Sequence, residues 1–131
     1  MNKTQLLILI VDDNSHFVER MIGLIGETDN IGQIQIASDY DEAYNFFSEK
    51  IPDLVLLDIN LPGKSGIELL KEIKKTGMEC KIIMITNHTD DYYRELCKEL
   101  GADHFLDKSN DFAIVPGLIR ELNQHWQITG S

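Results

Sequence analysis

The chain alternates short apolar runs with longer amphipathic stretches. Residues 6–11, 54–57 and 81–85 are continuous runs rich in Leu, Ile and Val, a pattern typical of strands that are buried on both faces. Residues 33–38 begin with alternating Gln and Ile, which indicates a half-exposed edge strand. A short fifth strand is predicted at residues 104–106. The pattern therefore predicts five strands.

Between these strands, apolar residues recur at intervals of three and four, as they do along one face of a helix. Asp39 with Glu42, and Ser65 with Glu68, have the spacing of a capping box at a helix start. Pro116, followed by a glycine, predicts an irregular first turn in the last helix. The helical stripes lie within residues 15–25, 39–47, 65–75, 93–100 and 112–126.

Strict alternation of strands and helices predicts an α/β fold. Such chains form a parallel sheet with right-handed crossovers and helices on both faces. The 131 residues are enough for one substantial core but not for two. We place a single domain at residues 4–124 and treat residues 125–131 as a C-terminal tail or linker stub.

Composition narrows the choice of partners. The chain has 12 Lys plus Arg against 22 Asp plus Glu, a formal net charge of −10. Such a surface repels phosphate backbones and anionic lipid, so we expect no direct nucleic-acid partner and no membrane partner. The longest purely apolar run, residues 6–11, is far shorter than the roughly 20 residues of a spanning helix. With 2 Cys, too few for a disulfide scaffold, the sequence predicts a soluble cytoplasmic protein.

Polar residues stand where the predicted strands end. Asp12 and Asp13 follow the first buried run, and Asp58 follows the second. Thr86 closes the third, and Lys108 comes just after the last strand. Because the carboxyl ends of parallel strands meet at one edge of a sheet, we expect these side chains to converge there.

The chemistry of this set favours phosphoryl transfer. Clustered carboxylates repel one another, and a shared proton or a hard cation relieves the repulsion. An oxygen-only ligand set favours Mg²⁺ over zinc or iron. Lys108 adds a positive charge and Thr86 a neutral donor. A metal and a lysine can neutralise phosphoryl oxygens while a carboxylate receives the group.

Four segments, in order along the chain, resemble those of the receiver domain of two-component response regulators. The resemblance covers nearly the whole chain and implies a CheY-like, flavodoxin-like fold, with a five-stranded parallel sheet in the order 2-1-3-4-5. The segments are I-L-I-V-D-D-N, L-V-L-L-D-I-N-L-P-G-K-S-G-I-E-L-L, I-I-M-I-T and G-A-D-H-F-L-D-K.

The resemblance also implies a role for each acidic residue. Asp58 would accept a phosphoryl group from the phosphohistidine of a sensor histidine kinase or phosphotransfer protein. Asp13, Asp58 and the backbone carbonyl of Asn60 would ligate Mg²⁺ directly. Asp12 would hold a metal-bound water.

By the same resemblance, Lys108 and Thr86 would bind the new acyl phosphate. Movement of Thr86 toward the phosphate would let Phe105 turn inward and change the surface of the fourth helix, fifth strand and fifth helix. A downstream effector would read that surface. The protein would be a monomer or a phosphorylation-linked dimer.

Asn87 departs from the family pattern, in which the residue after the switch threonine is usually small. With Asn60 and His88 it flanks the path of a hydrolytic water, so these three residues are candidates for setting the lifetime of the acyl phosphate. Asn87 also sustains an alternative, a phosphate-independent protein-interaction module on the same fold.

Two enzymatic alternatives fit the residues poorly. A Mg²⁺-dependent phosphohydrolase with Asp58 as nucleophile usually has an acid/base carboxylate two residues on, where this chain has Asn60. The tripeptide at residues 63–65 has the Gly-Lys-Ser of a P-loop, but Asp58 stands where the P-loop needs a further glycine. We therefore expect a phosphoacceptor with at most slow self-dephosphorylation, and not a turnover enzyme.

Overall fold

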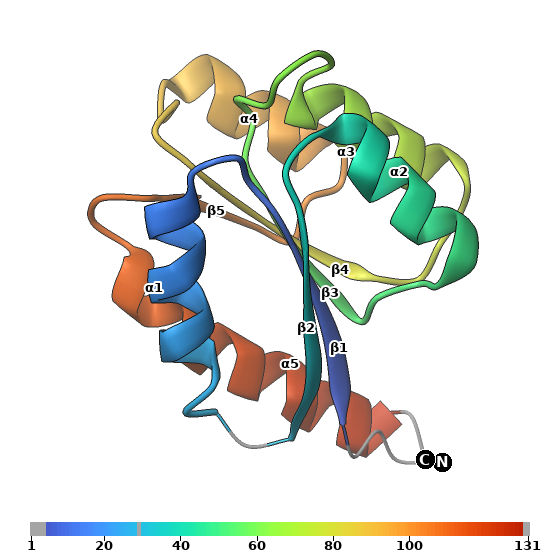
Figure 1. Ribbon diagram of the computed structural model, residues 1–131, viewed down its shortest axis with the longest axis vertical. Helices are drawn as coiled ribbons and strands as arrows, with labels where there is room; N and C mark the ends of the chain where they lie inside the picture. Colours follow the sequence, from blue (N-terminus) through green and yellow to red (C-terminus); the bar gives the residue numbers. More distant parts are fainter. Residues whose placement is uncertain (1–4, 29, 130–131) are drawn as a thin grey trace.

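In the computed structural model, strands and helices alternate along the whole described chain (Figure 1). It describes residues 5–28 and 30–129, and the side chains of residues 5–28 and 30–122. The elements are β1 (Leu6–Val11), α1 (Ser15–Ile25), β2 (Ile31–Ala37), α2 (Tyr40–Glu49), β3 (Leu54–Leu57), α3 (Gly66–Lys75), β4 (Lys81–Thr86), α4 (Asp91–Glu99), β5 (His104–Asp107), the 3₁₀ helix η1 (Phe112–Ile114) and α5 (Val115–Thr129).

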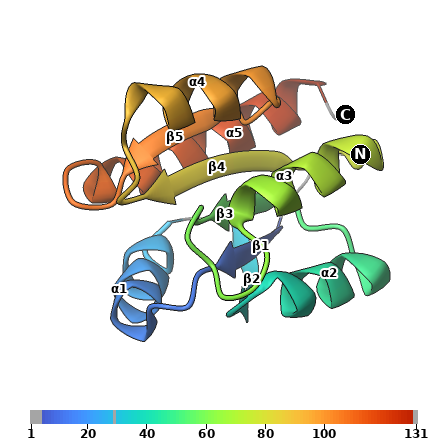
Figure 2. The same ribbon diagram turned by 90° about the horizontal axis from the view of Figure 1, so that it is seen from above.

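The strands form one parallel sheet in the order β2-β1-β3-β4-β5, which confirms the predicted fold class and strand order. β1 and β3 lie at the centre, with Val11 beside Leu57 at their carboxyl ends. Helices α1 and α5 cover one face of the sheet, and α2, α3 and α4 cover the other (Figures 1 and 2). The strand order changes direction between β1 and β3, and ligands of such sheets bind beyond the strand ends at that point.

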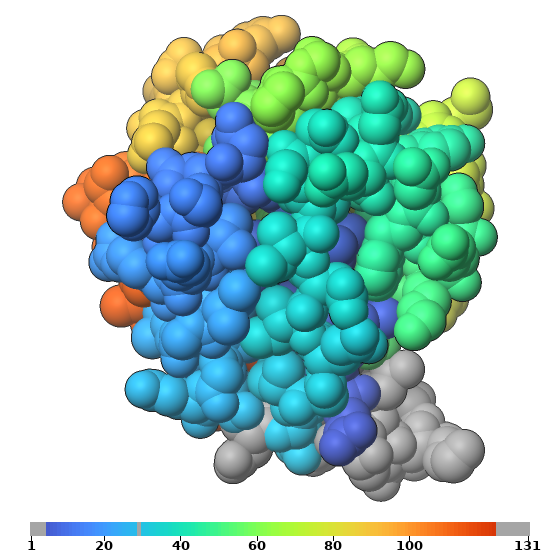
Figure 3. Space-filling view, viewed as in Figure 1, coloured from blue at the N-terminus to red at the C-terminus, as the bar shows by residue number. Residues whose placement is uncertain are grey.

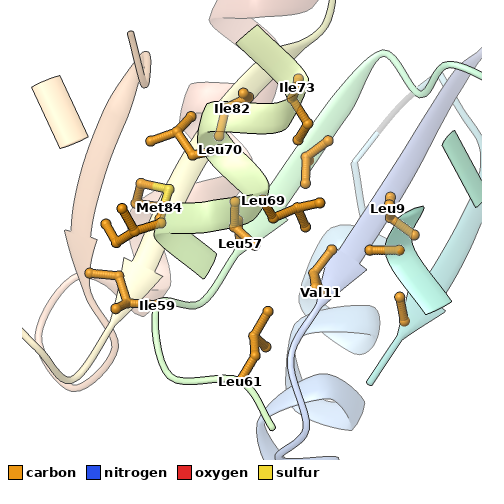
Figure 4. Close-up of a cluster of buried hydrophobic side chains, with 14 of the residues drawn as sticks. Leu9, Val11, Leu57, Ile59, Leu61, Leu69, Leu70, Ile73, Ile82 and Met84 are labelled. Carbon is orange, nitrogen blue, oxygen red and sulfur yellow. The ribbon is translucent and has the colours of Figure 1, made fainter. Parts of the chain in front are cut away.

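The core consists of two apolar layers, one on each face of the sheet. Leu9 and Val11 of β1 point into the layer under α2, α3 and α4, while Ile8 and Ile10 point into the layer under α1 and α5. This two-sided burial is the reason why the central strands are apolar at every position. Figure 4 shows the first layer, in which Leu70 of α3 packs over the sheet.

The edge strand β2 differs from its prediction. It spans Ile31–Ala37 instead of residues 33–38, because Ile31 already pairs with Leu6. It ends before Ser38, whose backbone N–H donates to the side chain of Glu42 at 2.8 Å instead of joining the ladder. In the space-filling view, β2 lies at the surface between α1 and α2 (Figure 3).

Side-chain caps begin helices α1, α2 and α3. Asn14 caps α1 by accepting from the N–H of Phe17 at 3.1 Å. Asp39 caps α2 through the N–H of Glu42 at 2.8 Å, but the Glu42 carboxylate returns to Ser38, one residue earlier than in a capping box. Ser65 caps α3, as predicted.

The predicted irregular start of the last helix is confirmed, since the 3₁₀ turn η1 precedes α5. Helix α5 continues through Thr129 and so takes in most of residues 125–131, which the sequence suggested as a tail. The predicted domain start at residue 4 and the side chain of Trp126 lie outside the described residues. No helix in the described part of the chain is both long and apolar enough to cross a bilayer.

Candidate functional site

The carboxylates at the strand ends come together as predicted. Backbone hydrogen bonds hold two of them in the sheet, because the N–H of Asp12 donates to Ala37 O and the N–H of Asp58 donates to Val11 O, both at 3.0 Å. Asp13 follows directly in the chain. Carboxylate oxygens of Asp12, Asp13 and Asp58 lie within 4.8 Å of one another.

The three carboxylates differ in exposure and in their partners. Asp12 is 2% exposed and Asp58 is 5% exposed, whereas Asp13 is open to solvent. Oδ1 of Asp12 accepts the N–H of Asn14 at 2.9 Å, and Oδ1 of Asp58 accepts the N–H of Asn60 at 3.3 Å. In each buried carboxylate, the loop that follows the strand holds one oxygen and leaves the other for a different partner.

Lys108 is that partner. Its Nζ lies 2.9 Å from Oδ2 of Asp58, in hydrogen-bond geometry, and 2.7 Å from Oδ2 of Asp12. The contact with Asp12 is a close ion pair without the angle of a hydrogen bond. Oδ2 of Asp12 is therefore buried with no hydrogen-bond partner among the described residues.

Burial raises the pKa of Asp12 above its usual value, although the Lys108 ammonium and the N–H of Asn14 oppose that shift. Burial alone would lower the pKa of Lys108, but the close contacts of its ammonium with the carboxylates of Asp12 and Asp58 outweigh burial and raise that pKa. Lys108 is thus charged at neutral pH. One lysine faces a cluster of three carboxylates, so a further cation at the site would be stabilised.

The cluster borders a hollow of about 130 Å³, which we call the site hollow. The carboxylate oxygens of Asp12, Asp13 and Asp58 fit a hard divalent cation such as Mg²⁺. Asn60, Asn87 and His88 line the hollow, as expected for residues that flank the acceptor. Ligation by the Asn60 carbonyl stays a prediction. The lining residues are Asp13, Asn14, Asp58, Asn60, Asn87, His88 and Lys108.

The two predicted switch residues, Thr86 and Phe105, are not among the residues that line the site hollow. Thr86 is fully buried at the end of β4, and its hydroxyl oxygen accepts the N–H of His88 at 3.1 Å. Phe105 on β5 is half-buried, with the Arg94 guanidinium 4.7 Å from its ring centroid. Arg94 also donates to the carbonyl of Phe105 at 3.4 Å. The Phe105 ring thus contacts α4.

The sequence analysis missed two residues that support the site. A Cβ on Gly66 would overlap the carbonyl oxygen of Asp58, and the N–H of Gly66 donates to Ile59 O at 2.8 Å. The capping pattern around Ser65 contained this glycine but not the contact. Phe17 lies in the apolar stripe predicted within residues 15–25, which indicates only a core position, yet its ring centroid lies 4.6 Å from Nζ of Lys108.

Known proteins are similar to this chain in sequence and in fold. The family model described as the response regulator receiver domain matches residues 8–119. This chain belongs to that family. The receiver domain is 35% identical over 128 residues to the transcriptional regulatory protein CpxR of Escherichia coli K12, covering 96% of this chain and 52% of CpxR.

A second relative and a solved structure are similar to this chain as well. The phosphate regulon transcriptional regulatory protein PhoB of Escherichia coli K12 is 35% identical over 103 residues, covering 77% of this chain and 44% of PhoB. The crystal structure of the Mn²⁺-bound form of response regulator Rcp1 has a TM-score of 0.75 and 25% identity, covering 95% of this chain and 96% of Rcp1. The receiver domain spans about half the length of the curated relatives that it matches.

Family membership confirms the prediction of a response-regulator receiver domain of two-component signal transduction, for which phosphorelay is the general role. Receiver domains of response regulators interact with histidine kinases and with effectors. The role of each residue in this chain has to be argued from the site itself.

Proposed function

We propose that this receiver domain accepts a phosphoryl group on Asp58 from the phosphohistidine of a sensor histidine kinase or phosphotransfer protein. The position of Asp58 is the observation that carries the proposal. Its carboxylate is buried at the centre of the sheet edge, borders the site hollow, and is held by Asn60 and Lys108. A nucleophile fixed beside an ammonium is suited to attack an anionic phosphoryl group.

In this reaction, a carboxylate oxygen of Asp58 forms the new P–O bond as the P–N bond to the donor histidine breaks. The electron pair of the broken bond remains on the imidazole nitrogen. Lys108 gives up its hydrogen bond to the Asp58 carboxylate and pairs with the phosphoryl oxygens. Mg²⁺, when held by Asp13, Asp58 and the Asn60 carbonyl, with Asp12 binding one of its waters, would supply further charge neutralisation.

We propose that the receiver domain is a phosphoacceptor and not a turnover enzyme. Position 60, two residues beyond the acceptor, is an amide and offers no acid/base carboxylate for hydrolysis. Asn60, Asn87 and His88 line the site hollow and would set how readily water reaches the acyl phosphate. We expect self-dephosphorylation to be slow.

The proposed output is a shift between two packings of the same fold. Thr86 would exchange its contact with His88 for the phosphoryl group, and Phe105 would leave Arg94 and turn inward. That change would alter the face formed by α4, β5 and α5, which a downstream effector would bind. The effector, a cytoplasmic location and a monomer or phosphorylation-linked dimer all stay predictions.

The alternative is a phosphate-independent interaction module. Asn87 lines the site hollow, where its amide occupies space beside the acceptor. If this amide blocks access, the fold would present its surfaces without being phosphorylated.

Intact-protein mass after incubation with Mg²⁺ and acetyl phosphate tests the proposal. We expect one added phosphoryl group on the wild type and none on Asp58→Asn. Asp91→Asn is the matched control, because Asp91 is an exposed carboxylate on α4, and it should be labelled like the wild type. Labelling of Asp58→Asn at another residue would overturn the acceptor assignment. A wild type that neither gains mass nor binds beryllofluoride, a phosphoryl analogue, in the presence of Mg²⁺ would favour the interaction module.

A further inference from the structure

The ammonium of Lys108 lies over the ring of Phe17, 4.6 Å from its centroid. Phe17 is in the first turn of α1, and Lys108 follows β5 at the opposite end of the chain. The ring is 7% exposed and belongs to the apolar layer under α1 and α5. Phe17 therefore contacts both the core and the charged centre of the site.

Neighbouring side chains hold this ring. Phe17 packs against Phe112 of η1 with ring centroids 5.8 Å apart and an angle of 78° between the ring planes. The guanidinium of Arg20 lies 4.5 Å from the centroid of Phe112. Each ring of this edge-to-face pair therefore also makes a cation–π contact, Phe17 with Lys108 and Phe112 with Arg20. The ring quadrupoles favour both kinds of contact.

The ring differs from the other partners of Lys108 in one respect. Asp12 and Asp58, which pair with the ammonium at 2.7 and 2.9 Å, are also expected to serve the metal. A bound cation would weaken their attraction for Lys108, because it draws on the same carboxylates. The Phe17 ring carries no oxygen ligand, so it is available to the ammonium in either state.

We propose that Phe17 is a positioning residue that holds the Lys108 ammonium at the site hollow when the carboxylates are engaged. The inference rests on the proposed phosphoryl-acceptor function of this site. Without the ring, the lysine would have to be ordered when the phosphoryl group binds, which lowers affinity for that group. Cation binding by the carboxylates does not need the ring.

The tests compare Phe17→Leu, Phe17→Tyr and Phe47→Leu. Phe47 is a matched control, because it is 8% exposed and packs on the opposite face of the sheet. We measure the affinity for Mg²⁺ alone and the affinity for beryllofluoride at saturating Mg²⁺. Phe17→Leu is expected to weaken beryllofluoride binding about tenfold, the size of a partly desolvated cation–π contact. Its Mg²⁺ affinity should stay within about twofold of wild type, the span of a few tenths of a kcal/mol.

Phe17→Tyr keeps a ring face and should bind beryllofluoride like the wild type, and Phe47→Leu should lose only stability. NMR of the protein at saturating Mg²⁺, when the carboxylates are engaged by the cation, supplies a second readout. The ε-methylene protons of Lys108 should be shifted upfield by the ring in the wild type and in Phe17→Tyr. In Phe17→Leu the Lys108 side chain should become more mobile. Phe17→Met replaces Phe17→Leu if the latter does not fold.

An ordinary chemical shift for Lys108 in the wild type would overturn the proposal, as would unchanged mobility in Phe17→Leu. If Phe17→Leu weakened the binding of Mg²⁺ and of beryllofluoride equally, or weakened neither, Phe17 would be only a core residue with no role in positioning Lys108. If the wild type binds no beryllofluoride, the proposed function fails, and the NMR comparison in Mg²⁺ still decides whether Phe17 positions Lys108.

Discussion

The ammonium of Lys108 donates a hydrogen bond to Oδ2 of Asp58 at 2.9 Å, so the proposed phosphoacceptor already pairs with a cation of the protein itself. The same ammonium lies 2.7 Å from Asp12. A divalent cation must compete with this lysine for the carboxylates. A phosphoryl group, in contrast, would gain the lysine as a partner. Lys108 is therefore expected to oppose metal binding and to favour phosphoryl binding.

Replacing Lys108 should separate these two effects. Lys108→Met removes the competing charge, so the affinity for Mg²⁺ should rise about three- to tenfold, while beryllofluoride binding at saturating Mg²⁺ should fall by at least about tenfold. Titration calorimetry measures both affinities. Lys71→Met is the control, because Lys71 is exposed and pairs with Glu68 at 3.7 Å, in a contact between neighbouring turns of α3. A weaker Mg²⁺ affinity in Lys108→Met would contradict the competition.

The raised pKa of Asp12 predicts how the stability of the metal-free protein depends on pH. In the folded chain this pKa lies above its ordinary value of 3.8, chiefly because the carboxylate is buried. The folded state therefore holds the proton more tightly than the unfolded state. The stability that this difference in pKa contributes is fully present below the pKa of the unfolded state, and it is lost as pH rises through the pKa of the folded state. At neutral pH the ionised Asp12 costs stability.

Asp12→Asn avoids that cost, since the amide does not ionise. In the presence of chelator, the free energy of unfolding of Asp12→Asn minus that of the wild type should increase as pH rises from 3.8 toward 7. Urea unfolding at a series of pH values measures the difference. Asp13→Asn is the control, because Asp13 is exposed. A difference between Asp12→Asn and wild type that does not vary with pH would refute this account.

The contact of Gly66 with the acceptor loop makes a stability prediction. Gly66→Ala places a methyl group against the carbonyl oxygen of Asp58, a backbone atom that cannot move aside without disturbing the site. We expect a loss of about 1–3 kcal/mol in the free energy of unfolding, the usual cost of overpacking, together with slower phosphorylation. Denaturant unfolding and mass-detected labelling measure the two effects.

Gly23 provides the matched substitution. It lies within α1, and a Cβ there would meet no atom within 4 Å. Gly23→Ala should raise stability by up to about 1 kcal/mol, because alanine favours the helix. If the two variants behaved alike, the close approach at Gly66 would have no energetic consequence.

Asn87 bears on the choice between phosphoacceptor and interaction module. Its side chain lines the site hollow, so Asn87→Ala should widen access to Asp58 and raise the rate of labelling by acetyl phosphate about three- to tenfold. Mg²⁺ affinity should not change. Thr89→Ala, two residues further along the same loop, is the control. An unchanged rate would show that Asn87 does not restrict the acceptor.

Much of this receiver domain could be predicted from local signals. Strand positions follow from apolar runs such as residues 54–57, and helix starts follow from capping residues such as Ser65. The carboxylate cluster was predicted as well, because Asp12 and Asp58 stand next to strands whose carboxyl ends must meet in a parallel sheet. Errors were confined to boundaries, as at β2, where pairing with Leu6 decides the first residue.

By itself the sequence determined the fold class, the strand ends that carry the chemistry and the residue types found there, because these depend on neighbours within a few positions. Only the tertiary structure decided which oxygen of Asp58 faces Lys108, that Gly66 must lack a side chain, and that Phe17 lies beneath the lysine. The contacts of Lys108 join elements distant along the chain, and Gly66 meets Asp58 across the loop between β3 and α3. Their distances are set by packing across the sheet edge, which leaves no periodic signal in the sequence.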